Sequence, residues 1–189
     1  MTRGERSGSR NMEGAEAMIV EKGAKKKRNI VLVGMSGAGK STLGVLLAKA
    51  LGMDFVDTDL VIQQQEGRLL QAIIDQDGIE AFMAVEESVV SALQVNDCII
   101  ATGGSVIYSE KAMHALRQGG QIVYLHVSYE EIMRRLGNVA TRGIVMKNGH
   151  TLQDVYEERV PLYRQYSDVT IDCAKKEIEQ CVREIVELL

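Results

Sequence analysis

Short apolar runs along this chain alternate with longer stretches in which apolar residues recur every three or four positions. The short runs, rich in β-branched and aliphatic residues, predict strands at residues 29–33, 55–57, 98–101, 121–126 and 169–172. The longer stretches predict helices at residues 40–51, 59–65, 79–93, 109–118, 129–136, 152–165 and 175–188. This alternation indicates an α/β domain of three layers, in which a five-stranded parallel sheet is flanked by helices.

Chemically useful turns follow the first three predicted strands. The first strand leads into a glycine-rich turn, the second into Asp57-Thr58-Asp59, and the third into Thr102-Gly103-Gly104-Ser105. In an open α/β sheet, ligands bind beyond the carboxyl ends of the strands. The sequence therefore predicts one site that these three turns share.

The glycine-rich turn, residues 34–42, reads GMSGAGKST and fits the phosphate-binding pattern G-x-x-x-x-G-K-[ST]. Backbone N–H groups of such a turn, with the following helix N-terminus, surround the phosphates of a nucleotide. The residues predicted to bind ATP in this way are Gly37, Ala38, Gly39, Lys40, Ser41 and Thr42. A turn without a ligand is the alternative, and the coincidence of strand, full motif and helix disfavours it.

Two acidic residues, Asp57 and Asp59, lie two positions apart at the end of the second strand. In extended backbone, side chains at this spacing point to one face. One carboxylate would help to hold a hydrated Mg²⁺, and the other would approach an acceptor hydroxyl group. The alternative is that they cap the next helix, a role that fits Asp59 better than Asp57.

Composition narrows the class of protein. The chain has 189 residues and a formal net charge of −4, and residues 1–28 carry eight Lys or Arg against four Asp or Glu. We predict a disordered basic tail over residues 1–28 and one acidic domain over residues 29–189, with no nucleic-acid partner. Because no apolar run approaches about 20 residues, we expect no membrane span and a cytoplasmic location. We also expect a monomer.

Five segments in order carry a resemblance to a known family: GMSGAGKST, FVDTD, DGIEAFMAVE, ATGGS and ERVPLY. Together they are similar to the shikimate kinases, small P-loop kinases of the nucleoside-monophosphate-kinase type. The resemblance implies transfer of the ATP γ-phosphate to the 3-hydroxyl of shikimate, with Mg²⁺ as cofactor. It also implies that Lys40 and Ser41 serve ATP and Mg²⁺, that Asp57 supports the metal, and that Asp59 holds or activates the acceptor hydroxyl.

The same resemblance assigns roles to residues farther along the chain. Gly103 and Gly104 would present backbone N–H groups to the substrate, and Arg159 would pair with its carboxylate. Arg142 matches an arginine of the family's mobile lid that reaches the transferring phosphate, and Arg135 matches a residue near the adenine. Without the resemblance, Arg159 reads better as a surface helix charge paired with an adjacent glutamate.

The stretch of residues 137–151 is rich in Gly, Asn, Thr and Lys and lies between two predicted helices. Irregular loops of this length are usually functional, and a kinase needs a lid that excludes water from ATP. We therefore predict a lid near residues 137–151. Arg142 within it is a candidate catalytic residue, although a solvated surface arginine fits the local sequence nearly as well.

Two departures concern the substrate end of the site. Met83 stands where the family's F-R-x-x-E pattern has an arginine for the substrate carboxylate, and Ser105 replaces the family's third glycine. Methionine can neither donate a hydrogen bond to a carboxylate nor balance its charge. Two alternatives therefore remain beside shikimate kinase: a related kinase with another hydroxylated acceptor, and a non-catalytic regulator that binds nucleotide.

Overall fold

The computed structural model describes residues 29–137, 144–146 and 149–189. The predicted tail, residues 1–28, and the lid residue Arg142 lie outside these ranges. Five strands form one parallel sheet in the order β2-β3-β1-β4-β5. Their bounds are β1 Asn29–Val33, β2 Asp54–Asp57, β3 Cys98–Ala101, β4 Gly120–His126 and β5 Val169–Asp172.

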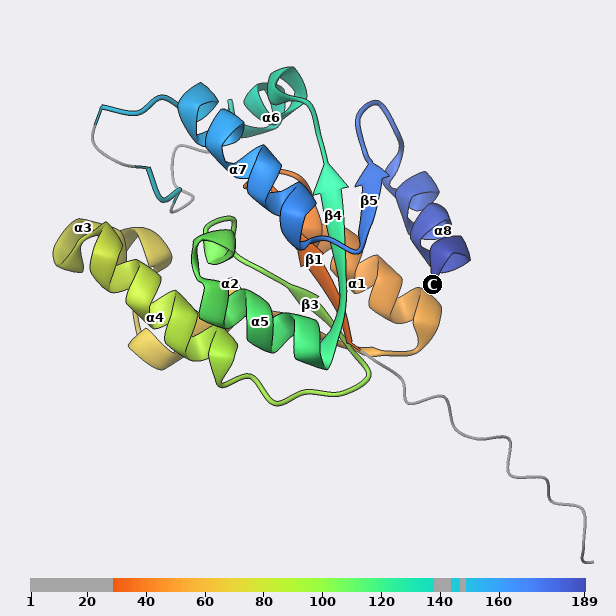
Figure 1. Ribbon diagram of the computed structural model, residues 1–189, viewed down its shortest axis with the longest axis horizontal. Helices are drawn as coiled ribbons and strands as arrows, with labels where there is room; N and C mark the ends of the chain where they lie inside the picture. The colour runs from red at the N-terminus through yellow and green to blue at the C-terminus, as the bar shows by residue number, and fades with distance from the viewer. Residues whose placement is uncertain (1–28, 138–143, 147–148) are drawn as a thin grey trace, which may run out of the picture.

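Helices cover both faces of the sheet, as Figure 1 shows. Helices α1 and α8 pack against each other beside β1, β3 and β5, whereas α5 and α7 contact β4 from the other side. The helices are α1 Lys40–Leu51, α2 Thr58–Glu66, α3 Leu70–Asp77, α4 Ile79–Ser91, α5 Glu110–Gly119, α6 Tyr129–Leu136, α7 Leu152–Tyr166 and α8 Ile178–Leu188. A short 3-10 helix, η1 Val106–Tyr108, follows β3. The predicted three-layer architecture is confirmed.

The central strand β1 lies at the heart of the core. All five of its residues are buried, and it pairs with β3 on one side and β4 on the other. A continuous apolar run is what a parallel strand covered on both faces requires. Because β1 is paired along both edges and covered on both faces, it holds in place the first residues of the turn that follows it.

A second, smaller apolar cluster lies away from the sheet. It is built from Ile62 of α2, Ile73 of α3, Phe82 and Val89 of α4, and Val145. Helix α4 also packs on α5, so the cluster is joined to the main body. The cluster therefore fixes α2 and α4 relative to the carboxyl edge of the sheet.

One helix is missing from the sequence-based prediction. The sequence pattern predicts no element between α2 and α4, but this region forms α3, which begins at Leu70 without a side-chain cap. Gly67 and Gly78 have φ of 64° and 88°, a left-handed conformation that suits glycine, and they separate α2, α3 and α4. The helix is short, and it is stabilised by packing of Ile73 rather than by a local start signal.

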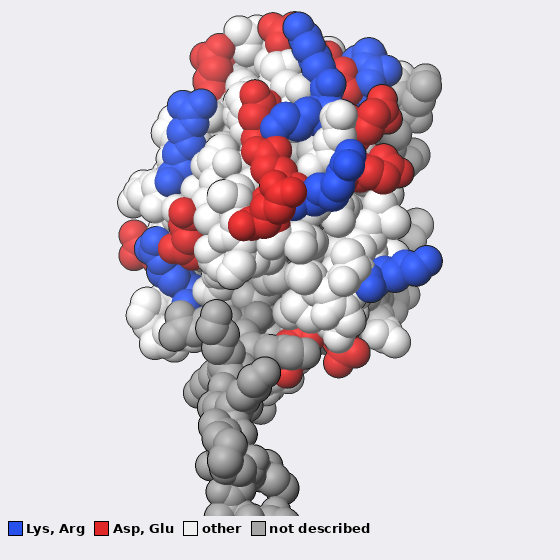
Figure 2. Space-filling model, turned by 90° about the vertical axis from the view of Figure 1, so that its right-hand side faces the viewer, with Lys and Arg blue, Asp and Glu red and all other residues white. Residues whose placement is uncertain are grey.

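Within the described residues, no helix combines the length and the apolar character needed to cross a membrane. On the face of the molecule in Figure 2, basic and acidic side chains are interspersed over the described part of the surface. That face presents no continuous basic track of the kind that nucleic-acid-binding proteins use.

Candidate active site

The phosphate-binding turn forms between β1 and α1, as predicted. Gly37 and Gly39 have φ of 85° and 97°, which non-glycine residues rarely adopt. Lys40 opens α1 and folds back over the turn, where its Nζ donates hydrogen bonds to the carbonyl oxygens of Gly34 (2.7 Å) and Met35 (3.0 Å). These contacts hold an ammonium group beside the backbone that would surround the phosphates.

Burial governs the charge of Lys40. Desolvation lowers the pKa of its ammonium group to about 8, and the carboxylates of Asp59 and Asp57 oppose that shift. A buried ammonium group is costly unless negative charge accompanies it. An incoming polyphosphate would supply such charge.

A cavity of about 320 Å³ connects the turn to the ends of two neighbouring strands. Lys40 and Ser41 line it from α1, Asp59 from α2, and Thr102 and Gly104 from the segment after β3. The Thr102 hydroxyl donates to the carbonyl oxygen of Leu32, 2.9 Å away, and so ties the β3 turn to β1. The three turns predicted to lie at the carboxyl edge of the sheet thus all contribute residues to one cavity.

Asp57 and Asp59 have different positions in the structure, and the capping residue is not the one that the alternative favoured. Asp57 is the cap of α2, because the backbone N–H of Asp59 donates to Asp57 Oδ1 at 3.0 Å. Asp59 lies in the first turn of α2 and lines the cavity. The alternative in which Asp59 caps the helix is wrong, because α2 begins at Thr58, one residue before the predicted start.

Gly103 leaves no room for a side chain, and Gly104 leaves little. A Cβ atom on Gly103 would collide with Glu86 Oε1 and lie 2.9 Å from Asp59 Oδ1, and one on Gly104 would lie 3.0 Å from the Ser36 hydroxyl. The expected donor role fits Gly103 poorly in this structure, because its N–H donates to Thr58 Oγ1 at 3.1 Å. Gly104 lines the cavity itself.

A buried carboxyl group that the sequence reading did not assign lies behind Gly103. Glu86 is 2% exposed, and Ser105 donates to its Oε2 at 2.6 Å. Its other oxygen, Oε1, is buried and has no hydrogen-bond partner among the described residues. Desolvation raises the pKa of Glu86 to about 7, and the bond from Ser105 only partly offsets it. The feature that marks Glu86 is the burial of its carboxyl group beside the cavity, and burial of a glutamate cannot be read from the sequence.

Arg159 is drawn into the interior of the protein. Its residue is 1% exposed, so the interpretation as a surface charge beside Glu157 or Glu158 is wrong. The guanidinium Nε donates to the Tyr108 hydroxyl (3.2 Å), and Nη2 donates to the carbonyl oxygen of Val145 (2.6 Å). These partners are neutral, which makes the group suited to receive an anion.

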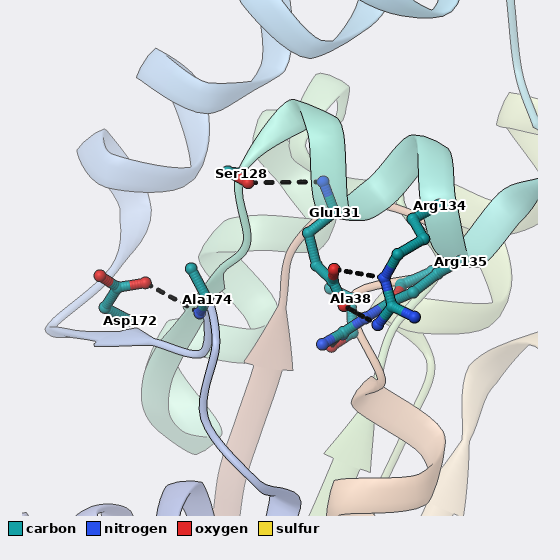
Figure 3. Close-up of polar contacts among 8 residues, drawn as sticks. Ala38, Ser128, Glu131, Arg134, Arg135, Asp172 and Ala174 are labelled. Atoms are coloured by element: carbon teal, nitrogen blue, oxygen red, sulfur yellow. Dashed lines mark hydrogen bonds and ion pairs between the residues drawn. The ribbon is translucent and has the colours of Figure 1, made fainter.

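On the other side of the phosphate-binding turn, Arg135 reaches from α6 (Figure 3). Its Nη1 donates to the carbonyl oxygens of Ala38 (3.2 Å) and Gly37 (3.4 Å), and its Nε donates to Glu131 Oε1 (2.7 Å). Arg135 also lines a second cavity of about 510 Å³ beside Ala38. This position agrees with the expectation that Arg135 lies next to a bound nucleotide.

The structure shows the surroundings of Met83, which stands where the family pattern has an arginine. Met83 packs with the smaller apolar cluster and lines a cavity of about 100 Å³ together with Tyr108 and Val145. No positive charge enters from α4 at this position. Among the described residues that carry the predicted site, Arg159 therefore supplies the cationic group at this end.

The donor set for a metal is small. The described part of the chain holds no group of three or more His, Cys, Asp or Glu side chains arranged for a metal ion. Ser41 offers a hydroxyl oxygen in the cavity and Asp57 a carboxylate near Lys40. Few protein oxygens suit Mg²⁺ that arrives with nucleotide phosphates, because that ion keeps several of its waters.

Comparisons with known proteins agree with this geometry. The shikimate kinase family model matches residues 36–189. A shikimate kinase of Pseudomonas paraeruginosa is 38% identical over 85% of this chain and 95% of its own length, and one of Mycobacterium ulcerans is 38% identical over 84% and 88%. The solved shikimate kinase from Acinetobacter baumannii in complex with shikimate superposes with a TM-score of 0.80 at 31% identity, covering 86% of this chain and 92% of that one. Because the family model covers most of the chain and these relatives match it over more than four fifths of its length, the chain belongs to the shikimate kinase family.

Proposed function

We propose that this protein is a shikimate kinase that transfers the γ-phosphate of ATP to the 3-hydroxyl of shikimate. The observation that carries the proposal is the single cavity in which Lys40 of the phosphate-binding turn faces Asp59 and Gly104. A phosphate held by the turn would lie beside an acceptor held at the strand ends. Proximity of this kind is a major part of catalysis of phosphoryl transfer.

The donor half of the reaction falls to the residues around the turn. Backbone N–H groups of residues 37–42 would bind the phosphates of ATP, and Lys40 would balance charge that builds on the transferring group. Arg135 would flank the rest of the nucleotide from α6. Arg142, outside the described residues, is proposed to bring a further positive charge to the phosphate from the lid near residues 137–151.

The acceptor half falls to the opposite wall. Asp59 would accept the hydrogen bond of the attacking hydroxyl and take its proton as that oxygen bonds to the γ-phosphorus, while the bond from this phosphorus to the bridging oxygen breaks and ADP leaves. Arg159 would pair with the substrate carboxylate, which accounts for a buried guanidinium whose hydrogen bonds within the described residues go to neutral groups. Gly104, which lines the cavity, would allow the acceptor to approach the backbone closely, whereas Gly103 lies against Glu86 and Asp59.

Mg²⁺ is part of the proposal. The hydroxyl of Ser41 and the carboxylate of Asp57 are the residues that would hold it, with the remaining positions filled by phosphate oxygens and water. When bound, the ion offsets negative charge on the phosphates. We further propose that the protein acts in the cytoplasm and as a monomer.

The test is ADP release from Mg-ATP with and without shikimate, followed by identification of the phosphorylated product. We expect strong dependence on shikimate. If the protein binds ATP but shikimate does not stimulate ADP release, a related kinase with another acceptor replaces this proposal. If a panel of hydroxylated metabolites also fails, the non-catalytic regulator replaces it.

A matched pair of lysine variants on α1 tests the assigned machinery. Lys40→Ala should lower kcat by a factor of about 100 or more, which is typical for loss of one stabilising group at the transition state. Lys49→Ala, in the last turn of the same helix, should keep wild-type turnover. Full turnover by the Lys40→Ala protein would reject the assignment.

A further inference from the structure

Two of the contacts that orient the Arg159 guanidinium come from one aromatic side chain. Tyr108, from η1, accepts the hydrogen bond of Arg159 Nε at 3.2 Å, and the guanidinium carbon lies 5.1 Å from the centre of the Tyr108 ring. This distance is within the range of a cation–π contact. Val145 provides the third contact, through its carbonyl oxygen at 2.6 Å from Nη2.

These contacts leave one nitrogen directed elsewhere. A Cβ atom built on Gly104 would lie 3.1 Å from Arg159 Nη1 and 3.0 Å from the hydroxyl of Ser36. Ser36 and Gly104 both line the cavity that contains Lys40 and Asp59. Nη1 thus lies beside Gly104, which lines that cavity, whereas Nε and Nη2 are held by Tyr108 and Val145.

Tyr108 also borders a largely apolar cavity, to which Glu158 and His150 contribute as well. Tyr108 lines the cavity of about 100 Å³ with Met83, Ile79 and Val145. Met83 cannot share the charge of a substrate carboxylate with Arg159. A single cation must then be aimed accurately, because a bidentate or end-on contact with a carboxylate depends strongly on direction.

We propose that Tyr108 is a positioning residue for the acceptor: it fixes the Arg159 guanidinium so that Nη1 meets the carboxylate of shikimate. The inference rests on the proposed function, in which Arg159 binds that carboxylate. Tyr108 does not touch the substrate in this arrangement. An arginine side chain has several rotatable bonds, and a ring and a hydroxyl that already hold it reduce the entropy lost on binding.

The experiment compares two acceptors, shikimate and its neutral carboxamide analogue, with each of two variants. Tyr108→Phe removes the hydroxyl and keeps the ring, and Tyr108→Leu removes both. We expect KM for shikimate to rise about threefold to tenfold in Tyr108→Phe and further in Tyr108→Leu, with kcat and KM for ATP close to wild type. In the same variants, the ratio of kcat/KM for shikimate to kcat/KM for the carboxamide should fall.

That ratio separates positioning from a purely structural role. A variant that only loosens the fold would lower kcat/KM for both acceptors alike and leave the ratio unchanged, which would overturn the inference. Tyr156→Phe is the matched control, since its hydroxyl donates to the carbonyl oxygen of Val127 at 3.0 Å, a bond with neither Arg159 nor the cavity. We expect its ratio to equal that of the wild type.

The remaining outcomes are also decisive. If the wild type does not phosphorylate shikimate, the proposed function fails, and the Tyr108 variants are not needed to show it. If the wild type uses shikimate and the carboxamide equally well, the function stands and the role of Tyr108 is rejected. If Tyr108→Leu does not fold, Tyr108→Phe alone decides, because it keeps the packing of the ring.

Discussion

Ser105 and Glu86 form a buried hydrogen bond of 2.6 Å that joins the turn after β3 to α4. Both residues are buried, and Glu86 lies beside Gly103, close to Asp59. The substitution of serine for the family's glycine therefore has a partner in this fold. It supplies the hydroxyl donor that satisfies one oxygen of a buried carboxyl group.

We first predict that Ser105→Ala lowers the free energy of unfolding by about 1–3 kcal/mol, because it leaves Glu86 Oε2 buried without its donor. Urea denaturation measures the loss. Ser105→Thr, which keeps a hydroxyl, should lose less. The control is Ser167→Ala, since the exposed Ser167 hydroxyl bonds only to local groups of its own turn. Equal stability of Ser105→Ala and the wild type would contradict the prediction.

The raised pKa of Glu86 gives a second prediction, on pH dependence. The folded protein binds this proton more tightly than the unfolded chain, since the pKa rises from 4.5 to about 7 on folding. The resulting stabilisation is full below about pH 4.5 and is lost as the pH rises through about 7. In Glu86→Gln this contribution is absent, so the variant should gain stability relative to the wild type as the pH rises.

Urea denaturation of both proteins between about pH 5 and pH 8 checks this sign. Asp59, Arg159 and Lys40 are the charged groups that act on Glu86, and both proteins retain them. A stability difference that stays constant with pH would show that Glu86 titrates normally.

Our third prediction concerns the close packing at Gly103. Gly103→Ala places a methyl group against Glu86 Oε1 and Asp59 Oδ1, so we expect lower stability and at least a tenfold drop in acceptor-dependent turnover, of the order seen when reacting groups are displaced. Gly119→Ala is the matched control at the end of α5. The nearest atom to its Cβ would be Asn29 Nδ2 at 3.5 Å, an ordinary contact. Wild-type turnover by Gly103→Ala would refute the tight fit.

A fourth prediction separates two neighbouring arginines of α6, both drawn in Figure 3. Arg134 and Arg135 each pair with Glu131 at 2.7 Å, but only Arg135 is seen to reach the carbonyl oxygens of the phosphate-binding turn. Arg135→Ala should raise KM for ATP several-fold and leave KM for shikimate close to wild type. Arg134→Ala, whose side chain is 75% exposed, should change neither constant. Similar KM values for ATP in the two variants would remove Arg135 from the nucleotide site.

The fifth prediction tests the departure at position 83. Met83→Arg would bring a second cation to the acceptor end, one helical turn from Glu86, and should lower KM for shikimate several-fold if shikimate is the natural acceptor. The substitution would also place a charged group beside the smaller apolar cluster, which destabilises the folded protein, so the melting temperature should fall. Steady-state kinetics with shikimate measures the gain. An unchanged or higher KM would favour an acceptor other than shikimate.

Local sequence was sufficient for the five strands and the phosphate-binding turn of this protein, although not for α3. Apolar runs predicted all five strands, and the order of glycine, lysine and serine in residues 34–42 predicted the phosphate-binding turn at the start of α1. These features depend on neighbouring residues: strand burial follows the hydrophobic pattern, and the turn requires glycines where φ is positive. The family resemblance then supplied candidate roles for the site.

Only the tertiary structure decided which polar side chains are buried and what they contact. Arg159 reads as a surface charge from its neighbours in α7, yet Tyr108 and Val145, far away in sequence, surround it. Glu86 likewise acquires its donor from Ser105, 19 positions along the chain. The physical reason is that burial and pKa depend on what other elements bring to a side chain, whereas periodicity and turn motifs report only on the segment that contains them.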